Sequence, residues 1–143
     1  GNICRSPIAE GVMKMLVQEN QLNWEISSAG TNGLHNGEAP HEYSQKVCAQ
    51  HGIDISDQVS AWITLSEAKA ATVLYALATD VVRDLKRMLP ADQHAKIKLL
   101  LDELYPGQNR SVKDPWYGDW PDYIDVYEEI EAACQQIIEK FKI

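Results

Sequence analysis

Two short apolar runs constrain the fold of this chain most strongly. Residues 72–77 read TVLYAL and residues 96–101 read KIKLLL, and neither run alternates apolar with polar residues. Such runs are typical of parallel strands that are buried on both faces. Stretches with helical periodicity lie before, between and after them, so helices alternate with buried strands. This order predicts an α/β fold, an open parallel sheet with helices on both faces.

The remaining elements follow from the spacing of apolar residues and from cap signals. We expect helices over residues 7–20, 40–50, 80–88 and 121–141, and a helical turn over residues 64–70. Ser6 before Pro7 suits an N-cap followed by a proline in the first turn. Residues 24–29 (WEISSA) predict a third strand. The pattern lacks only the strand that should lead into residues 1–6, which would make the sheet four-stranded.

The composition suits one domain over residues 1–143. The chain is 45% apolar, which is enough for a single core. No apolar run approaches the roughly 18 residues of a membrane span, and the first residues do not resemble a signal peptide. The formal net charge is −8, with 21 acidic and 13 basic residues. A surplus of acidic residues argues against nucleic acid or a membrane surface as a partner.

The cysteines and histidines further limit the chemistry and the cellular compartment expected for this chain. Three cysteines at wide spacing indicate a reducing compartment, so we expect a cytoplasmic protein. Cys48 and Cys134 lie in helical patterns and fit ordinary core positions. The four histidines have no paired spacing and the chain has no CxxC motif. We therefore predict no metal site.

The stretch GNICRS, residues 1–6, has the properties of an anion-binding loop. Gly1 and Asn2 tolerate positive φ, so successive N–H groups can turn toward one ligand. The helix that follows directs its positive end to the same place, and Arg5 adds a planar fork that matches two phosphate oxygens. In open α/β sheets, ligands bind beyond the carboxyl ends of the strands, where this loop would lie. The alternative is an ordinary loop with a surface arginine.

A second motif, KDPWYG, occupies residues 113–118 in the long loop after the last strand. This position would place it at the same edge of the sheet. Asp114 is flanked by aromatic residues, and it could serve as a general acid beside a slot for an aromatic ring. The alternative is a simple proline-containing turn. The two motifs together are much more specific than either one alone.

Together the two motifs resemble the low-molecular-weight protein tyrosine phosphatases. That family carries C-x-G-N-I-C-R-S-P after its first strand and D-P-[WY]-Y-G near its C-terminus. Here GNICRSP stands at residues 1–7, DPWYG at residues 114–118 and the similar SSAG at residues 27–30. The order of elements also matches over essentially the whole chain. The resemblance implies an enzyme that hydrolyses phosphotyrosine in proteins through a phosphocysteine intermediate, without a metal or cofactor.

The resemblance also implies roles for individual residues. The phosphate-binding loop, which would hold inorganic phosphate or similar oxyanions, comprises Gly1, Asn2, Ile3, Cys4 and Arg5. The catalytic residues would be Arg5, which stabilises the phosphoryl oxygens, Asp114, which is the general acid and base, and Ser6, which supports the nucleophile. The loop would be supported by Asn2, Ser28 and Gln58, and the substrate pocket walled by Leu34, Trp116 and Tyr117.

Some positions depart from the family pattern. Leu34 stands where the pocket wall is usually aromatic, and Gln58 where the family often has histidine. Ala61 and Ala78 replace an expected arginine and aspartate, with effects on stability or on recognition that stay open. Ile3 stands where related arginine phosphatases have threonine. The isoleucine favours an aryl phosphate, or it simply packs beneath the loop.

The nucleophile of the family is the first cysteine of C-x5-R, which here falls before Gly1. Cys4 cannot replace it, because the residue six positions later is Glu10. We expect the natural protein to continue upstream with a central strand and this cysteine, so that residues 1–143 are an N-terminally truncated domain. Cys4 then suggests a redox hypothesis, in which a reversible disulfide with the nucleophile protects it from over-oxidation.

Two other functions compete with this interpretation. An arsenate reductase of the same fold needs two further cysteines close together, and residues 49–133 contain none. A non-catalytic module could bind phosphate or phosphotyrosine through Arg5 and the loop without turnover.

Overall fold

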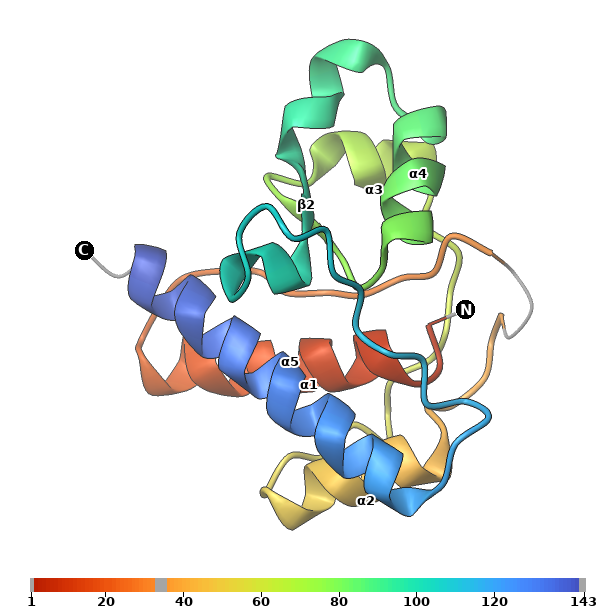
Figure 1. The fold of residues 1–143 in the computed structure, drawn as a ribbon, viewed down its shortest axis with the longest axis vertical. Coiled ribbons are helices and arrows are strands. Elements are labelled where there is room, and N and C mark those ends of the chain that lie inside the picture. The colour runs from red at the N-terminus through yellow and green to blue at the C-terminus, as the bar shows by residue number, and fades with distance from the viewer. Residues whose placement is uncertain (1, 33–35, 142–143) are drawn as a thin grey trace.

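The structure is a computed structural model, and it describes residues 2–32 and 36–141. Its helices are α1 (Arg5–Glu19), α2 (Glu42–Gln50), α3 (Leu65–Ala70), α4 (Thr79–Met88) and α5 (Trp120–Phe141). Its strands are β1 (Leu74–Ala76) and β2 (Ile97–Leu99), and short 3-10 helices η1 (Ala91–Lys96) and η2 (Leu100–Glu103) flank β2. The five predicted helical stretches are confirmed, with bounds shifted by one or two residues. Figure 1 shows the arrangement.

The two strands form a parallel pair, with Leu74 opposite Ile97 and Ala76 opposite Leu99. Alternate residues point to opposite faces of a strand. On one face, Tyr75 and Leu77 pack against the main apolar core. Helix α4 packs against both strands. The sheet therefore carries helices on both faces, which confirms the predicted α/β class.

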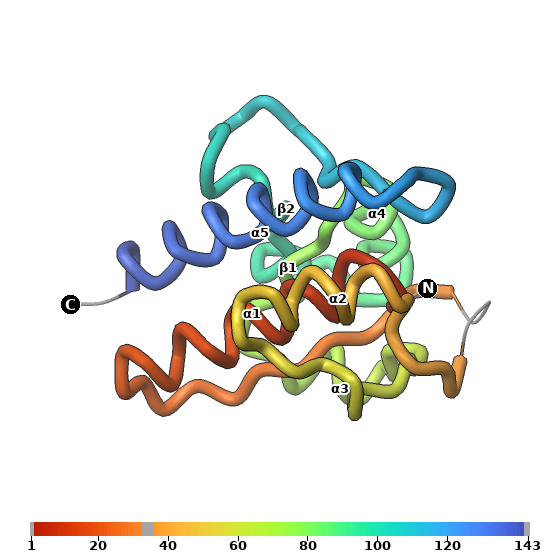
Figure 2. The backbone as a smooth tube through the Cα atoms, turned by 90° about the horizontal axis from the view of Figure 1, so that it is seen from below, coloured from red at the N-terminus to blue at the C-terminus, as the bar shows by residue number. Residues whose placement is uncertain are grey.

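The core lies between α1, α2 and α5. Helix α5 crosses α1 obliquely, and α2 lies beside both (Figures 1 and 2). The predicted stripe of α5 is buried, including Tyr127, Ile130 and Ile138. Cys48 and Cys134 are buried in the same core, as expected of ordinary core cysteines. This layer fixes the N-terminus of α1 and the start of α5, the two ends that border the predicted site.

Of the four strands expected, one was placed before Gly1 and three within residues 1–143, and within the described residues two of these three form the sheet. Residues 24–29 alternate between half-buried and exposed positions, as a strand with one covered face does. Within the described chain, however, no backbone hydrogen bond joins them to another segment, and a strand requires such a ladder. Only Gly30, at the end of this stretch, forms a parallel bridge, with Trp62.

Candidate active site

The loop before α1 is compact and buried. Asn2 adopts a positive φ of 62°, and the side chains of Asn2, Ile3 and Cys4 are almost fully covered. Helix α1 begins at Arg5, with Cys4 at the N-cap position, so the predicted N-cap role of Ser6 is wrong. The Ser6 hydroxyl oxygen instead accepts a hydrogen bond from the side chain of Asn2 in the loop. The first turn of α1 contains no acidic residue, which leaves its positive end available to an anion.

Asn2 is the centre of a polar network that joins three segments. Its Nδ2 donates to Oγ of Ser6 at 2.6 Å and to Oγ of Ser28 at 3.0 Å. Its Oδ1 accepts from the backbone N–H of Ala61 at 3.4 Å. Because the Ser6 oxygen only accepts in this network, its proton stays available to donate to a neighbouring group. The network therefore holds the left-handed turn at Asn2 and orients Ser6.

The third predicted support residue contacts a different part of the loop. Nε2 of Gln58 donates to the carbonyl oxygen of Pro7 at 3.1 Å, in the first turn of α1. The structure thus brings Asn2 and Ser28 into direct contact and places Gln58 beside the start of the helix, separate from that pair.

Glu10 also belongs to this network, and it was not among the residues predicted from the sequence. Its Oε1 accepts from Oγ of Ser28 at 2.7 Å, and its Oε2 pairs with Nζ of Lys14 at 2.8 Å. Glu10 lies one helical turn after Ser6, so it shares the loop-facing side of α1. The four-residue spacing between Ser6 and Glu10 is the feature of the sequence that could have identified Glu10. The carboxylate fixes the direction of the Ser28 hydroxyl, which leaves the Ser28 oxygen to accept from Asn2.

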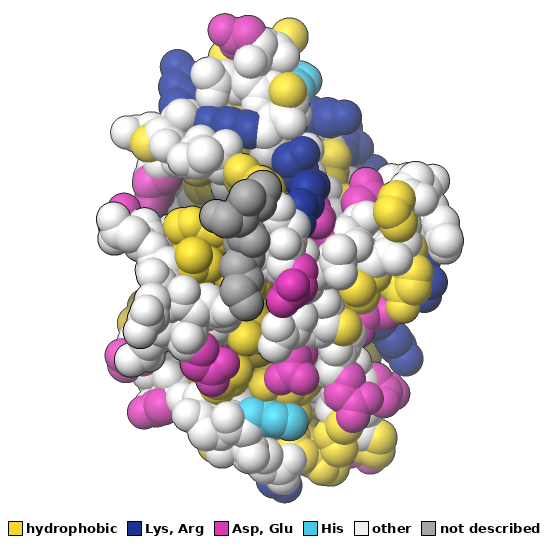
Figure 3. All heavy atoms as spheres, turned by 90° about the vertical axis from the view of Figure 1, so that its left-hand side faces the viewer, with side chains coloured by type: hydrophobic (Ala, Val, Ile, Leu, Met, Phe, Trp, Pro, Cys, Tyr) yellow, Lys and Arg dark blue, Asp and Glu magenta, His cyan; other side chains and the backbone are white. Residues whose placement is uncertain are grey.

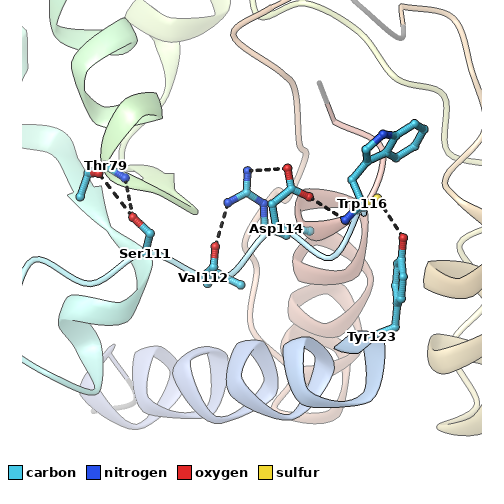
Figure 4. Close-up of polar contacts among 8 residues, drawn as sticks. Thr79, Ser111, Val112, Asp114, Trp116 and Tyr123 are labelled. Atoms are coloured by element: carbon cyan, nitrogen blue, oxygen red, sulfur yellow. Dashed lines mark hydrogen bonds and ion pairs between the residues drawn. The ribbon is translucent and has the colours of Figure 1, made fainter. Parts of the chain in front are cut away.

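The guanidinium of Arg5 connects the loop to the second motif (Figure 4). Its Nη1 donates to the carbonyl oxygen of Val112 at 2.8 Å, and its Nη2 lies 3.9 Å from Oδ2 of Asp114. The Arg5 side chain is 19% exposed and that of Asp114 is 55% exposed. The arginine is therefore held by a backbone carbonyl, while the carboxylate stays open to a ligand. The predicted meeting of the two motifs at one place is what the structure shows.

The aromatic residues after Asp114 line the outer side of the same loop. The backbone N–H of Trp116 donates to Oδ1 of Asp114 at 3.1 Å, which closes a turn around the carboxylate. The Trp116 ring meets the ring of His41 edge to face at 5.6 Å. Tyr117 is 95% exposed. Two further predicted residues, Gly1 and Leu34, lie outside the described residues.

His41 and Tyr123 also contact the loop, and neither was predicted because no local pattern in the sequence joins them to it. The backbone N–H of His41 donates to the carbonyl oxygen of Ile3 at 3.0 Å, and its ring stacks on Tyr123 at 5.0 Å. Ile3 packs with Cys4 and Tyr123 in a small apolar cluster. This burial supports the alternative that Ile3 packs beneath the loop.

Cys4 lies in surroundings that keep its thiol protonated. Its sulfur is buried 3.5 Å from the hydroxyl oxygen of Tyr123, and burial is the main cause that raises the thiol pKa. Its carbonyl oxygen accepts from Oγ of Ser44 at 3.0 Å, which ties the loop to α2. Nucleophilic cysteines instead occupy electropositive sites that lower the pKa. Cys4 therefore has the buried setting of a packing residue, with its sulfur against Tyr123.

The described residues contain neither a cluster of metal-binding side chains nor a helix suited to a membrane. Residues 2–32 and 36–141 hold no group of three or more His, Cys, Asp or Glu side chains that could bind a metal ion. No helix within these residues has the length and apolar character to span a membrane.

Comparisons with known proteins agree with the geometry. A sequence model of the family described as "Low molecular weight phosphotyrosine protein phosphatase" matches residues 1–142. The phosphatase of that name from Homo sapiens is 34% identical over 143 residues, which cover 98% of this chain and 90% of the human protein.

Solved structures share the whole fold. A protein tyrosine phosphatase from Entamoeba histolytica superposes with a TM-score of 0.92 at 31% identity, covering 99% of this chain and 92% of that chain. The Drosophila arginine phosphatase superposes with a TM-score of 0.91 at 25% identity, covering 100% and 94% of the two chains. From the family match and the human relative, the chain belongs to the low-molecular-weight phosphotyrosine protein phosphatases, a family of hydrolases.

Proposed function

We propose that this protein hydrolyses phosphotyrosine in cytoplasmic proteins through a phosphocysteine intermediate. The observation that carries the proposal is the position of Arg5, whose guanidinium lies between the Val112 carbonyl and the Asp114 carboxylate at the N-terminus of α1. A phosphoryl group at this place would meet a helix N-terminus and an arginine fork together. A general acid would stand within reach of its leaving group.

The nucleophile in this proposal is the thiolate of a cysteine that precedes Gly1, in the first position of C-x5-R. The positive end of α1 and Arg5 both lower the pKa of a thiol at that place. The sulfur attacks phosphorus and the bond from phosphorus to the phenolic oxygen breaks. Asp114 gives its proton to that oxygen as tyrosine leaves. Loop N–H groups and Arg5 stabilise the equatorial oxygens.

The second step returns the enzyme to its starting state. Asp114, now a carboxylate, takes a proton from water as the water oxygen attacks phosphorus. The phosphorus–sulfur bond breaks, phosphate leaves and the thiolate is restored. The Ser6 hydroxyl donates a hydrogen bond to the departing sulfur. Its oxygen already accepts from Asn2, so its proton is directed away from the network.

The choice of phosphotyrosine over phosphoarginine rests on the aromatic residues beside Asp114. Trp116 is 38% exposed and Tyr117 is 95% exposed, so both rings have solvent-exposed surface on which a phenyl ring could pack. The human relative carries "phosphotyrosine" in its name, whereas a similar fold in Drosophila is an arginine phosphatase. The buried side chain of Ile3 does not contribute to this choice.

The test compares two peptides of identical sequence, one with phosphotyrosine and one with phosphoarginine. Phosphate release is measured from both, and acid-quenched protein is mapped for phosphocysteine. We expect release mainly from the phosphotyrosine peptide and a phosphoryl group on the cysteine before Gly1. A preference for phosphoarginine would overturn the substrate assignment. Binding of phosphate or vanadate without turnover would instead show a binding module.

A further inference from the structure

A second positively charged feature lies on α4, outside the site described above. A hollow of about 360 Å³ is lined by Thr79, Val82, Arg83, Lys86, Arg87 and Asn109. We call this feature the α4 groove. The three cations lie three and four residues apart on α4, so they share one face of the helix. Asn109 comes from the loop that leads to Asp114.

The side chains of Arg83, Lys86 and Arg87 in the α4 groove are exposed. Within residues 2–32 and 36–141, no ion pair joins Arg83, Lys86 or Arg87 to a carboxylate. Asp84 on the same helix accepts a hydrogen bond from Thr31 at 2.9 Å instead. Asp80 is exposed in the first turn of α4. Among the described residues, the groove thus presents three cations without an ion-pair partner to an anionic ligand.

The charge of the whole chain makes this cluster unusual. Residues 64–113 contain eight of the 13 basic residues but only six of the 21 acidic ones, so this segment has net charge +2 and the rest of the chain −10. Figure 3 shows the same division on another face of the molecule, with most dark blue side chains in the upper half and most magenta ones below. An acidic ligand is therefore repelled by most of the surface and attracted here.

Hydrogen bonds tie the α4 groove to the candidate active site (Figure 4). Oγ of Ser111 accepts from the backbone N–H of Thr79 at 2.9 Å, and the N–H of Val112 donates to the carbonyl oxygen of Leu77 at 2.8 Å. The Val112 carbonyl in turn holds Arg5. The loop that carries Asp114 is therefore anchored at the end of β1 and the start of α4, beside the groove.

The reach of a peptide follows from chain geometry. Asp114 at the site lies five positions after Asn109 in the groove, and five extended residues span at most about 18 Å. A substrate peptide with its phosphotyrosine at Arg5 would thus reach the groove with residues about four to six positions away.

We propose that the α4 groove is a specificity site that binds acidic side chains of the substrate peptide, four to six residues from the phosphotyrosine. The inference rests on the proposed function, because the phosphotyrosine anchors the peptide. Arg83 and Arg87 contact the carboxylates and Lys86 adds long-range attraction. The groove gives an otherwise acidic protein a preference for acidic sequences around the phosphotyrosine.

The experiment measures the binding of fluorescent peptides by anisotropy at low salt, with Asp114→Asn as the common background for the phosphopeptides so that little of them is hydrolysed during the measurement. Phosphotyrosine peptides carry either glutamates or glutamines at positions four to six on both sides, and unphosphorylated versions of each serve as references. We expect the protein to bind the acidic phosphopeptide about tenfold more tightly than the neutral one, the effect of two or three exposed ion pairs. The preference should fall as salt is added.

The double variant Arg83→Gln/Arg87→Gln should reduce this preference to about twofold or less, with unchanged affinity for the neutral phosphopeptide. The control Lys69→Gln/Lys140→Gln removes the same charge at positions that do not line the groove, and it should keep the preference. A preference that survives in the groove variant, or disappears equally in the control, would overturn the proposal. Binding of both phosphopeptides no tighter than their unphosphorylated versions would overturn the proposed function instead.

If the acidic unphosphorylated peptide or inorganic phosphate alone binds the wild type and loses its affinity in the groove variant, the groove is a general anion site. That result would overturn the assignment to substrate. Thermal unfolding of both variants near the wild-type temperature confirms that the comparison is made on folded protein.

Discussion

Nη2 of Arg5 and Oδ2 of Asp114 lie 3.9 Å apart, although one residue begins the first helix and the other precedes the last. The pair is loose and Asp114 is exposed, so it contributes little to stability. The pair matters for function because it brings the guanidinium of Arg5, which can bind an anion, next to the titratable carboxyl of Asp114. A phosphoryl group on Arg5 would therefore lie within reach of the proton on Asp114.

The variant Arg5→Lys should bind inorganic phosphate or vanadate about tenfold to a hundredfold more weakly than the wild type. Lysine keeps the charge but loses the planar fork and its bond to the Val112 carbonyl. Isothermal titration calorimetry measures the change. Lys140→Gln, at the far end of α5, should bind phosphate as the wild type does. Equal affinity in the Arg5 variant would contradict the role of the fork.

The variant Asp114→Asn should lower kcat on a phosphotyrosine peptide by about a hundredfold or more, because an amide cannot supply the proton to the leaving phenol. Phosphate binding should be kept, since Arg5 remains held by Val112. For a substrate with a more acidic phenol, kcat should fall less, because that leaving group needs less protonation. The same loss on both substrates would argue against a general acid at this position.

The sequence predicted the fold class and the meeting of the two motifs because both follow from local patterns. Buried apolar runs mark parallel strands, and loops after such strands gather at one edge of a sheet. Residues 24–29 were overpredicted as a paired strand. Their alternation of burial is real, but the pairing of a strand depends on its neighbours, which no local pattern records.

Contacts between distant side chains could not be predicted in the same way. Tyr123 meets Cys4, and His41 meets both Ile3 and Trp116, across segments far apart in the chain that the packing of α2 and α5 on α1 brings together. The N-cap of α1 was placed wrongly at Ser6 because serine before proline is a frequent cap signal. Here Ser6 bonds with Asn2 instead, so the tertiary network overrides the local preference.

The variant Asn2→Ala should lower the free energy of unfolding by about 2–3 kcal/mol, because it removes the bonds to Ser6 and Ser28 and leaves alanine at a positive φ. Asn2→Gly removes the same bonds without backbone strain and should cost less. Urea unfolding measures both. Asn20→Ala, which removes one bond to a helix carbonyl, is a control with a smaller expected effect. A loss in Asn2→Ala no larger than in the control would contradict a central role for Asn2.

Stability should fall above about pH 9, where exposed thiols begin to ionise. Burial raises the pKa of Cys48 and of Cys134 to about 12, so the folded state keeps these protons while the unfolded state releases them. The stabilisation from these protonated thiols is complete below the thiol pKa of the unfolded state. It is lost as the pH rises toward the thiol pKa of the folded state. Urea unfolding between pH 8 and pH 11 should show a smaller decline in Cys48→Ala/Cys134→Ala. An unchanged slope would assign the decline to the buried tyrosines, whose pKa values are also raised.

The variant Gly11→Ala should destabilise the protein by about 1–3 kcal/mol, although alanine favours a helix by about 1 kcal/mol over glycine. A Cβ at this position would lie 2.6 Å from Cγ2 of Ile55 and 3.0 Å from Cγ2 of Ile53, so α1 and the segment after α2 must separate. That segment continues to Gln58, which bonds with Pro7 at the start of α1. Adding Ile55→Ala removes the closest contact, so the double variant should lose less stability than the two single changes together. Additive losses in this cycle would show that steric contact with Ile55 is not the cause.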